Sequence, residues 1–283
     1  MESAGMRMKT TDKILLYDDY CPLCTWYSGL FVRFHLLKPG NRVPFSKAGL
    51  SILTAIDIEK GKDEIPLFDP ATEQTIYGID ALLEILGQRM PFIKHIGDIK
   101  PVKWFLQKLY KLISYNRKVI VARKCGGGGF DCSPGFNVFY RLAFLFIFLL
   151  FNSFMLFPLH DHVFTHLSFY HLSSEQLQAA HLVFVGINCG VAVFIGKRMA
   201  IEYLGQINLL ALISILFLTL LLFITVVVPV PEWIVFGCLV LLTIFIIKEY
   251  FRRMEYAGIL AFYKIVMAIN IVCLVLFLAY VFY

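Results

Sequence analysis

The distribution of charged residues along this chain changes sharply near residue 137. Residues 1–137 hold 19 of the 26 Lys and Arg residues and 14 of the 20 Asp and Glu residues, and the rest of the chain is mostly apolar. A helix needs about 20 consecutive apolar residues to cross the hydrocarbon core of a bilayer. The sequence therefore predicts a soluble domain followed by a membrane domain.

Five apolar runs follow the soluble part. They span Val138–Phe157, Ala180–Gly196, Leu204–Val228, Trp233–Ile247 and Gly258–Tyr283. The first, third and fifth runs are long enough to span a bilayer, the second is at the lower limit, and the fourth is short unless flanking charged residues extend it. A soluble helix that is apolar on all sides is the alternative for the fourth run. We expect about five membrane-spanning helices, and no signal peptide in the polar first twelve residues.

Positive charge alternates between the segments that connect these runs. Lys and Arg occur in two of the connections, as Lys197 and Arg198 and as Lys248, Arg252 and Arg253. Residues 159–179 and 229–232 contain none. Because positively charged loops stay on the cytoplasmic side, the pattern predicts a multi-pass protein of the inner (cytoplasmic) membrane. The soluble domain is then cytosolic, and the C-terminus lies outside.

These patterns divide the chain into four parts. We expect an N-terminal tail over 1–12, a folded domain over 13–116, a basic Gly- and Cys-rich juxtamembrane linker over 117–137, and a membrane domain over 138–283. Basic residues gather before the membrane domain: Lys103, Lys108, Lys111, Arg117, Lys118, Arg123 and Lys124. Anionic membrane lipids, rather than a nucleic acid, are the partner that this patch predicts.

A Cys-x-x-Cys motif lies between a predicted strand and a predicted helix. Strand-forming residues 13–17 precede Asp18-Asp19-Tyr20-Cys21-Pro22-Leu23-Cys24, and apolar residues at helical spacing follow. Cys21 would lie at a helix N-terminus, where free N–H groups stabilise a thiolate. This favours redox chemistry with Cys21 as nucleophile and Cys24 as resolving thiol. Half of a zinc site and a merely structural pair are the alternatives.

Residues around the motif have two interpretations each. Asp18 is a candidate catalytic residue that relays a proton to or from the thiols. Alternatively, its carboxylate caps the turn between the strand and the helix. We expect Trp26 and Tyr27 to contribute to packing rather than to contact a substrate, because large aromatic side chains dominate core burial.

The soluble part resembles a known family. Its element order of strand, helix, strand, helix, hairpin and helix is that of thioredoxin-like domains, in which Pro66 would be the proline, often cis, that lies against the cysteines. The motif Leu15-Leu16-Tyr17-Asp18-x-x-Cys21-x-Leu23-Cys24 resembles the signature of the DCC family, as do Tyr77-Gly78, Ala81-Leu82 and the segment from Tyr110 to Asn116-Arg117. Asp19 replaces the usual Gly. The resemblance implies an α/β thioredoxin-like domain over roughly residues 12–135, and a thiol–disulfide oxidoreductase that requires no cofactor. An all-α transmembrane domain would follow.

Two further groups of side chains could bind metals. Cys125 and Cys132 flank four glycines, and we consider a second redox pair, a zinc site shared with Cys21 and Cys24, and a flexible hinge with unpaired cysteines. His160, His162 and His166 lie in the first predicted outer loop, with His162 and His166 at helical spacing. They could bind zinc, copper, haem or a quinone, or lie at the headgroups without a ligand.

The sequence thus predicts a membrane-anchored thiol–disulfide oxidoreductase that acts on a protein thiol or disulfide near the membrane. A zinc-stabilised regulatory or binding module and a transmembrane electron carrier are the alternatives. Within the membrane runs, Glu202 and Lys264 are candidates for an ion pair.

Overall fold

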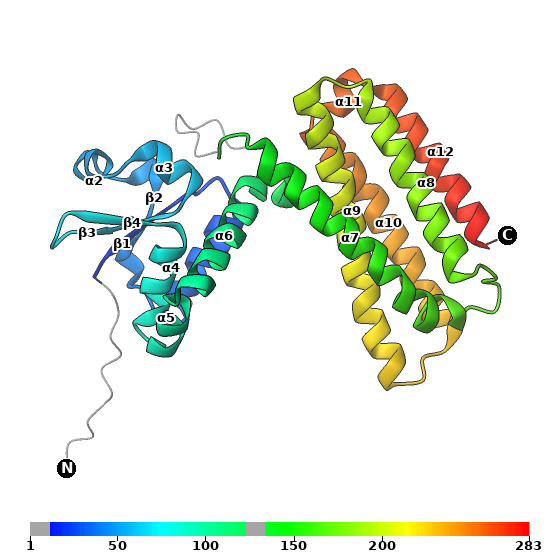
Figure 1. The fold of residues 1–283 in the computed structure, drawn as a ribbon, viewed down its shortest axis with the longest axis horizontal. Coiled ribbons are helices and arrows are strands. Elements are labelled where there is room, and N and C mark those ends of the chain that lie inside the picture. The colour runs from blue at the N-terminus through cyan, green and yellow to red at the C-terminus, as the bar shows by residue number, and fades with distance from the viewer. Residues whose placement is uncertain (1–11, 123–133, 283) are drawn as a thin grey trace, which may run out of the picture. The chain divides into compact units, whose positions relative to one another are not determined.

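The computed structural model describes residues 12–122 and 134–282. The chain divides into two compact units, Met1–Tyr140 and Arg141–Tyr283, which Figure 1 shows in blue to green and in green to red. Cys125 and Cys132 lie outside the described residues, so the three interpretations of that pair stay predictions.

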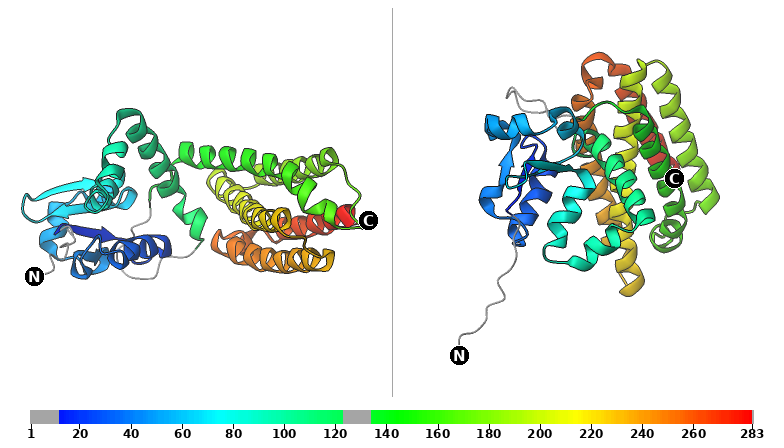
Figure 2. Two further views of the ribbon diagram at one scale, coloured as in Figure 1. Left: turned by 90° about the horizontal axis from the view of Figure 1, so that it is seen from below. Right: turned by 60° about the vertical axis from the view of Figure 1, so that its left-hand side comes forward.

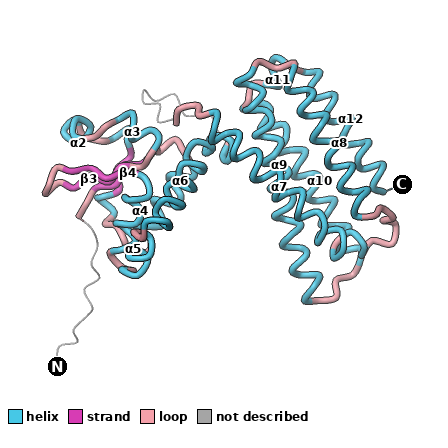
Figure 3. Tube along the Cα trace, in the orientation of Figure 1, coloured by secondary structure: helices cyan, strands magenta, loops and turns pink. Residues whose placement is uncertain are grey.

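A four-stranded sheet lies at the centre of the first unit. Its strands are β1 (Ile14–Tyr17), β2 (Arg42–Pro44), β3 (Pro66–Asp69) and β4 (Gln74–Tyr77), in the order β2-β1-β3-β4. β1 pairs parallel with β2, and the other two pairings are antiparallel. Figure 3 shows these short strands in magenta among the helices. Each strand has only three or four residues, yet Leu15, Leu16 and Leu67 from the strands lie in the buried core of the unit.

Helices cover both faces of this sheet. They are α1 (Pro22–Arg33), α2 (Leu50–Ala55), α3 (Ile58–Asp63), α4 (Gly78–Gly87), α5 (Pro91–Gly97) and α6 (Lys100–Val121), with short 3-10 turns η1 (Pro39–Asn41) and η2 (Phe45–Lys47). Successive residues of a strand point to opposite faces. Accordingly, Leu15 packs in a cluster with Ala81 and Ile85 of α4, whereas Leu16 packs with Phe45 on the other side.

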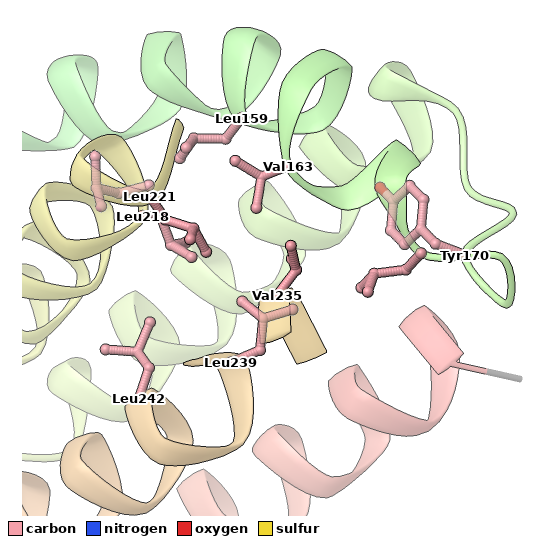
Figure 4. Close-up of a cluster of buried hydrophobic side chains, with 10 residues drawn as sticks. Leu159, Val163, Tyr170, Leu218, Leu221, Val235, Leu239 and Leu242 are labelled. Carbon is pink, nitrogen blue, oxygen red and sulfur yellow. The ribbon is translucent and has the colours of Figure 1, made fainter. Parts of the chain in front are cut away.

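The second unit is built from helices. They are α7 (Val138–His162), α8 (Ser174–Val193), α9 (Lys197–Val227), α10 (Glu232–Tyr256), α11 (Ile259–Phe262) and α12 (Lys264–Phe282), with the 3-10 turn η3 (Phe164–His166). Figure 2 shows α8, α9, α10 and α12 side by side. A cluster of buried leucines and valines joins α7, α9 and α10, as Figure 4 shows for Leu159, Leu218 and Leu239.

Four of the helices are long and apolar enough to cross a membrane. These segments are Val138–His166, Ser174–Val193, Lys197–Val227 and Glu232–Tyr256. Large apolar side chains on them are exposed, for example Val193 at 79% and Trp233 at 73%. An exposed apolar surface of this extent needs lipid or protein to cover it. By length and composition the chain is therefore a membrane protein, and the short fourth run is the N-terminal part of the long helix α10.

The predicted fold class, a thioredoxin-like α/β domain followed by about five spans, is wrong. Helices hold 75% of the described residues, and the only sheet among them has four short strands. The four strands have only three or four residues each, so the sheet is small beside the helices. Pro66 begins β3, and every described peptide bond is trans.

The fifth apolar run is not one continuous helix. Gly258 has a φ of +76°, and the run then divides into α11 and α12. The apolar helix Lys264–Tyr280 has fewer than 18 residues. The whole of α12, Lys264–Phe282, has 19 residues, which at 1.5 Å per residue is about 29 Å, close to the ~30 Å hydrocarbon core. The external C-terminus that we predicted depended on five crossings, and the described residues provide four candidates.

Candidate thiol site

Cys21 occupies the N-cap position of α1. Its backbone is extended, with φ −93° and ψ 110°, and its Sγ accepts a hydrogen bond from the Cys24 N–H at 3.4 Å. Pro22 provides the first helical residue, where a missing N–H costs nothing. The helix therefore offers Cys21 both a backbone donor and the positive end of its dipole, which are the conditions that stabilise a thiolate.

The turn before the helix is held by Asp18. Its Oδ1 accepts a hydrogen bond from the Tyr20 N–H at 3.0 Å, and its carbonyl oxygen accepts one from the Cys21 N–H at 3.3 Å. The cap of α1 is thus Cys21 itself, and Asp18 stabilises the preceding turn. Asp19, which replaces the glycine expected from the resemblance, has a side chain that accepts a hydrogen bond from Ser46 at 2.7 Å.

The guanidinium group of Arg117, a residue of α6, lies close to both Cys24 and Asp18. Arg117 Nη1 is 3.7 Å from Cys24 Sγ, and Arg117 Nη2 is 3.6 Å from Asp18 Oδ2. Nη2 also donates to the Lys62 carbonyl at 2.9 Å, at the end of α3. Asp18 and the Arg117 side chain are only 5% and 12% exposed, so little water screens this charge pair.

Neighbouring residues of α6 hold the arginine in this position. Ser114 Oγ donates to the Asp63 carbonyl, and the Tyr115 hydroxyl donates to Asp63 Oδ2 at 2.9 Å. The Asn116 side chain donates to the Leu112 carbonyl at 2.8 Å and to the Tyr140 carbonyl at 3.0 Å. The last turns of α6 are therefore anchored by the three side chains that directly precede Arg117. Residues 117–121, which we assigned to a linker, belong to this helix.

The two thiols have opposite pKa shifts. A side-chain hydrogen bond from the Cys24 thiol lowers the pKa of Cys21 to about 7. The charge of Arg117 also lowers this pKa, whereas burial opposes the shift. The same hydrogen bond, together with burial, raises the pKa of Cys24 far above that of a free cysteine. At neutral pH one sulfur is thus partly thiolate and the other is a thiol, which is the division that a nucleophile and a resolving cysteine require.

Other titratable groups surround the pair. Burial raises the pKa of the Asp18 carboxyl, although the charge of Arg117 opposes that shift. Burial also raises the pKa values of Tyr27 and Tyr110, so both phenols stay neutral. A carboxyl with a raised pKa beside a thiol is suited to accept or return a proton near neutral pH.

The thiols and Asp18 are also the one candidate metal group among residues 12–122 and 134–282. The ligand atoms of Asp18, Cys21 and Cys24 lie within 4.8 Å of one another. However, the permanently charged guanidinium of Arg117 is close to two of these three side chains, and a positive charge there disfavours a second cation. A four-thiolate site with Cys125 and Cys132 would require residues outside the described part.

The histidines predicted as a metal site do not converge on one point. His162 ends α7, and His166 lies in the 3-10 turn η3, so they do not share one helix face. His160 bonds instead to Asp161 Oδ1 at 2.7 Å and to the Leu172 carbonyl at 3.0 Å. Within the described residues, the ring of His160 is thus occupied by protein acceptors.

The structure corrects two further expectations. Trp26 is 63% exposed and is not a packing residue, whereas Tyr27 packs against the cluster around Leu15. Glu202 pairs with Arg141 at 3.1 Å rather than with Lys264.

Several members of the basic patch are engaged within the protein. Lys103 pairs with Asp80 at 2.7 Å, Lys111 pairs with Glu64 at 3.2 Å, and Arg117 belongs to the thiol site.

Sequence analysis missed Arg117, Tyr27 and Tyr110 as members of the site. Arg117 lies 93 residues from Cys24, so local spacing gave no reason to connect them. The resemblance of the segment from Tyr110 to Arg117 was the available signal, but it assigned no role. Comparisons with protein-family models, curated proteins and solved structures find no match for this chain.

Proposed function

We propose that this protein is a membrane-anchored thiol–disulfide oxidoreductase whose active pair is Cys21 and Cys24. The observation that carries the proposal is the geometry of the pair: Cys21 caps α1, its Sγ accepts a hydrogen bond from the Cys24 N–H at 3.4 Å, and Arg117 Nη1 lies 3.7 Å from Cys24 Sγ. The side-chain hydrogen bond between the thiols lowers the pKa of Cys21 to about 7 and, together with burial, raises the pKa of Cys24, which agrees with that geometry. The resemblance of the surrounding motif to the DCC family supports the same activity.

The exchange proceeds in two steps. The Cys21 thiolate attacks one sulfur of a partner disulfide, so that a mixed disulfide forms and the partner's other sulfur leaves as a thiolate. Cys24 then loses its proton and attacks the Cys21 sulfur, which forms the Cys21–Cys24 disulfide and releases the second partner thiolate. Two electrons pass from the cysteine pair to the partner, and the reverse sequence oxidises a partner dithiol. Asp18 is the group placed to take up the Cys24 proton.

Membrane lipids are the second partner in this proposal. One side of α6 exposes Trp104, Phe105, Leu109 and Ile113, and Lys108 lies over the Trp104 ring at 6.0 Å. Apolar and aromatic side chains with lysine on one helix face are typical of a helix that lies in the headgroup region. The lipid contact therefore centres on this face of α6 and not on Lys103, Lys111 or Arg117, which the protein itself engages.

The proposal also includes an orientation of the protein in the membrane. The connections that carry Lys197, Arg198, Arg252 and Arg253 lie on the cytosolic side of the inner membrane, together with the first unit. In the cytosol a Cys-x-x-Cys pair is kept mostly reduced, so the reduced form is the resting state of the enzyme.

Trapping of mixed disulfides tests the activity. In full-length protein with Cys24→Ser, the Cys21 adduct is not resolved, so we expect covalent partners that disappear on reduction and identify the substrate by mass spectrometry. Cys21→Ser should trap none, and Cys189→Ser, which changes an exposed cysteine of α8, should behave like the wild type. Equal trapping by the Cys21→Ser and Cys24→Ser proteins would contradict the proposal.

A zinc-binding module is the alternative that one observation favours, because three ligand atoms lie within 4.8 Å of one another. Metal analysis of reduced, full-length protein distinguishes the two functions. The redox proposal predicts far less than one zinc per chain, whereas a structural site predicts about one zinc, lost with Cys21→Ser.

A further inference from the structure

A cavity of about 250 Å³ lies within the second unit, lined by α7, α8, α9, α10 and α12. For comparison, a dry cavity of about 150 Å³ binds benzene. Four of its lining residues carry aromatic rings: Phe184, Tyr250, Phe251 and Phe277. Aromatic walls favour a flat ring, which they contact by offset stacking or edge-to-face packing.

Two side chains that line this cavity each carry a polar atom with no hydrogen-bond partner among the described residues. These atoms are His181 Nε2 and Asn270 Oδ1, both buried. The Asn270 amide is fixed from its other side, because Nδ2 donates to the Tyr203 hydroxyl at 2.8 Å and to the Tyr250 hydroxyl at 3.1 Å. Its Oδ1 is therefore left as an acceptor. Since buried polar atoms are nearly always paired, the two atoms indicate a ligand that carries oxygen.

The cavity reaches the apolar surface of the unit. Ile247, Phe251 and Ile271 line it and are 38–43% exposed. Ile247 and Phe251 lie in α10, one of the four helices that are long and apolar enough to span a membrane. A ligand that enters past these side chains comes from the hydrocarbon region, so it must dissolve in lipid.

We propose that this cavity binds the headgroup of a lipid-soluble quinone or its quinol. A flat ring fits the aromatic walls. A quinol hydroxyl donates to Asn270 Oδ1, and a quinone or quinol oxygen accepts from His181 when Nε2 carries the proton. A simple acyl chain fills the volume but leaves both polar atoms unpaired. The proposal concerns binding only and does not depend on the chemistry of Cys21 and Cys24.

Titration of full-length protein in lipid nanodiscs tests the proposal, with decylubiquinone and decylubiquinol as probes and with binding to empty nanodiscs subtracted. We expect saturable binding of one molecule per chain. His181→Phe removes the unpaired nitrogen, and Ala211→Leu fills part of the cavity. Each should weaken binding at least tenfold. His171→Phe, which changes an exposed histidine outside the cavity, should not.

Thermal unfolding of the same variants separates binding from structure. No hydrogen bond of the His181 ring to another described residue is present, so His181→Phe should unfold at the wild-type temperature or above it. Equal affinity in all four proteins, or no saturable binding, would overturn the proposal. So would decanoic acid binding as tightly as decylubiquinone with the same dependence on His181, because that result would assign the cavity to an acyl chain.

Discussion

Arg117 is the residue whose removal should most directly change the chemistry of the thiols. Its charge favours the thiolate of Cys21, so Arg117→Met should raise the pKa of Cys21 above about 7. A rise of about one unit lowers the thiolate fraction at pH 7 from about half to about a tenth. Alkylation rates of Cys21 by iodoacetamide, measured against pH, report this change. The rate rises with pH and levels off above the pKa, so wild type and variant should converge at high pH.

Arg117→Lys is the matched control for that measurement. Lysine keeps the charge but not the planar fork, so the pKa of Cys21 should lie between those of the wild type and Arg117→Met. An unchanged pH profile in Arg117→Met would show that the guanidinium does not act on the thiolate.

Asp18 should affect the two steps of the exchange in opposite directions. Its negative charge raises the pKa of Cys21. At pH 6.5, Cys21 of the Asp18→Asn protein should therefore react with iodoacetamide at least as fast as Cys21 of the wild type. Closure of the Cys21–Cys24 disulfide should slow about tenfold or more, which is the lower range for a lost general base. Single-turnover closure of a mixed disulfide measures that step. If closure kept its wild-type rate, Asp18 would only hold the turn.

The residue that precedes strand β3 donates its backbone N–H to a tyrosine hydroxyl of α6. The Ile65 N–H donates to Tyr110 Oη at 2.8 Å in the interior of the first unit. Tyr110→Phe leaves that N–H unpaired, at a cost of about 1–3 kcal/mol. Hydrogen exchange of the peptide that contains residues 65–69, measured on the full-length protein, should become at least fivefold faster.

Tyr77→Phe provides a matched comparison at the surface. The Asp57 N–H donates to Tyr77 Oη at 2.8 Å, but this hydrogen bond is exposed, so water replaces the hydroxyl. The free energy of local opening should then change by less than about 0.5 kcal/mol. If Tyr110→Phe accelerated hydrogen exchange around Ile65 no more than Tyr77→Phe accelerates it around Asp57, burial of the hydrogen bond would not matter for β3.

The elements of the membrane part were partly evident from composition. The first four apolar runs each correspond to a long helix, because length and hydropathy alone decide whether a helix can span a bilayer. The division of the fifth run was not evident, since it occurs at Tyr263, whose backbone (φ −129°, ψ 59°) leaves the helical conformation between α11 and α12. The small weight of the sheet beside the helices was not evident either, because three- and four-residue strands carry little periodic signal.

Two sets of hydrogen bonds indicate which connections of the second unit lie at the same end. The result agrees with the alternation of Lys and Arg between successive connections. Glu232, at the start of α10, accepts two hydrogen bonds from Ser168 at 2.8 Å, which places the two connections without Lys or Arg at one end. Arg253, near the end of α10, donates to Gln206 near the start of α9 at 2.7 Å. The two positively charged connections therefore lie at the other end.

Labelling of single cysteines in a cysteine-free chain tests the proposed orientation. Gly196→Cys and Glu255→Cys should react with a membrane-impermeant maleimide only from the cytosolic side. His171→Cys and Pro229→Cys should react only from outside, because their connections carry no Lys or Arg. A cysteine at exposed Ser51 reports the side of the first unit and should match Gly196. Labelling of Ser51 and His171 from the same side would exclude the proposed orientation.

By itself the sequence determined that this chain has a charged part and a membrane-embedding part, and that one Cys-x-x-Cys pair lies at the start of a helix. Those properties depend on composition and on neighbouring residues. Only the tertiary structure decided that Arg117 lies beside Cys24 and that His181 and Asn270 line one cavity. Each of these depends on the distance between residues far apart in the chain, which packing of the helices sets and local spacing does not.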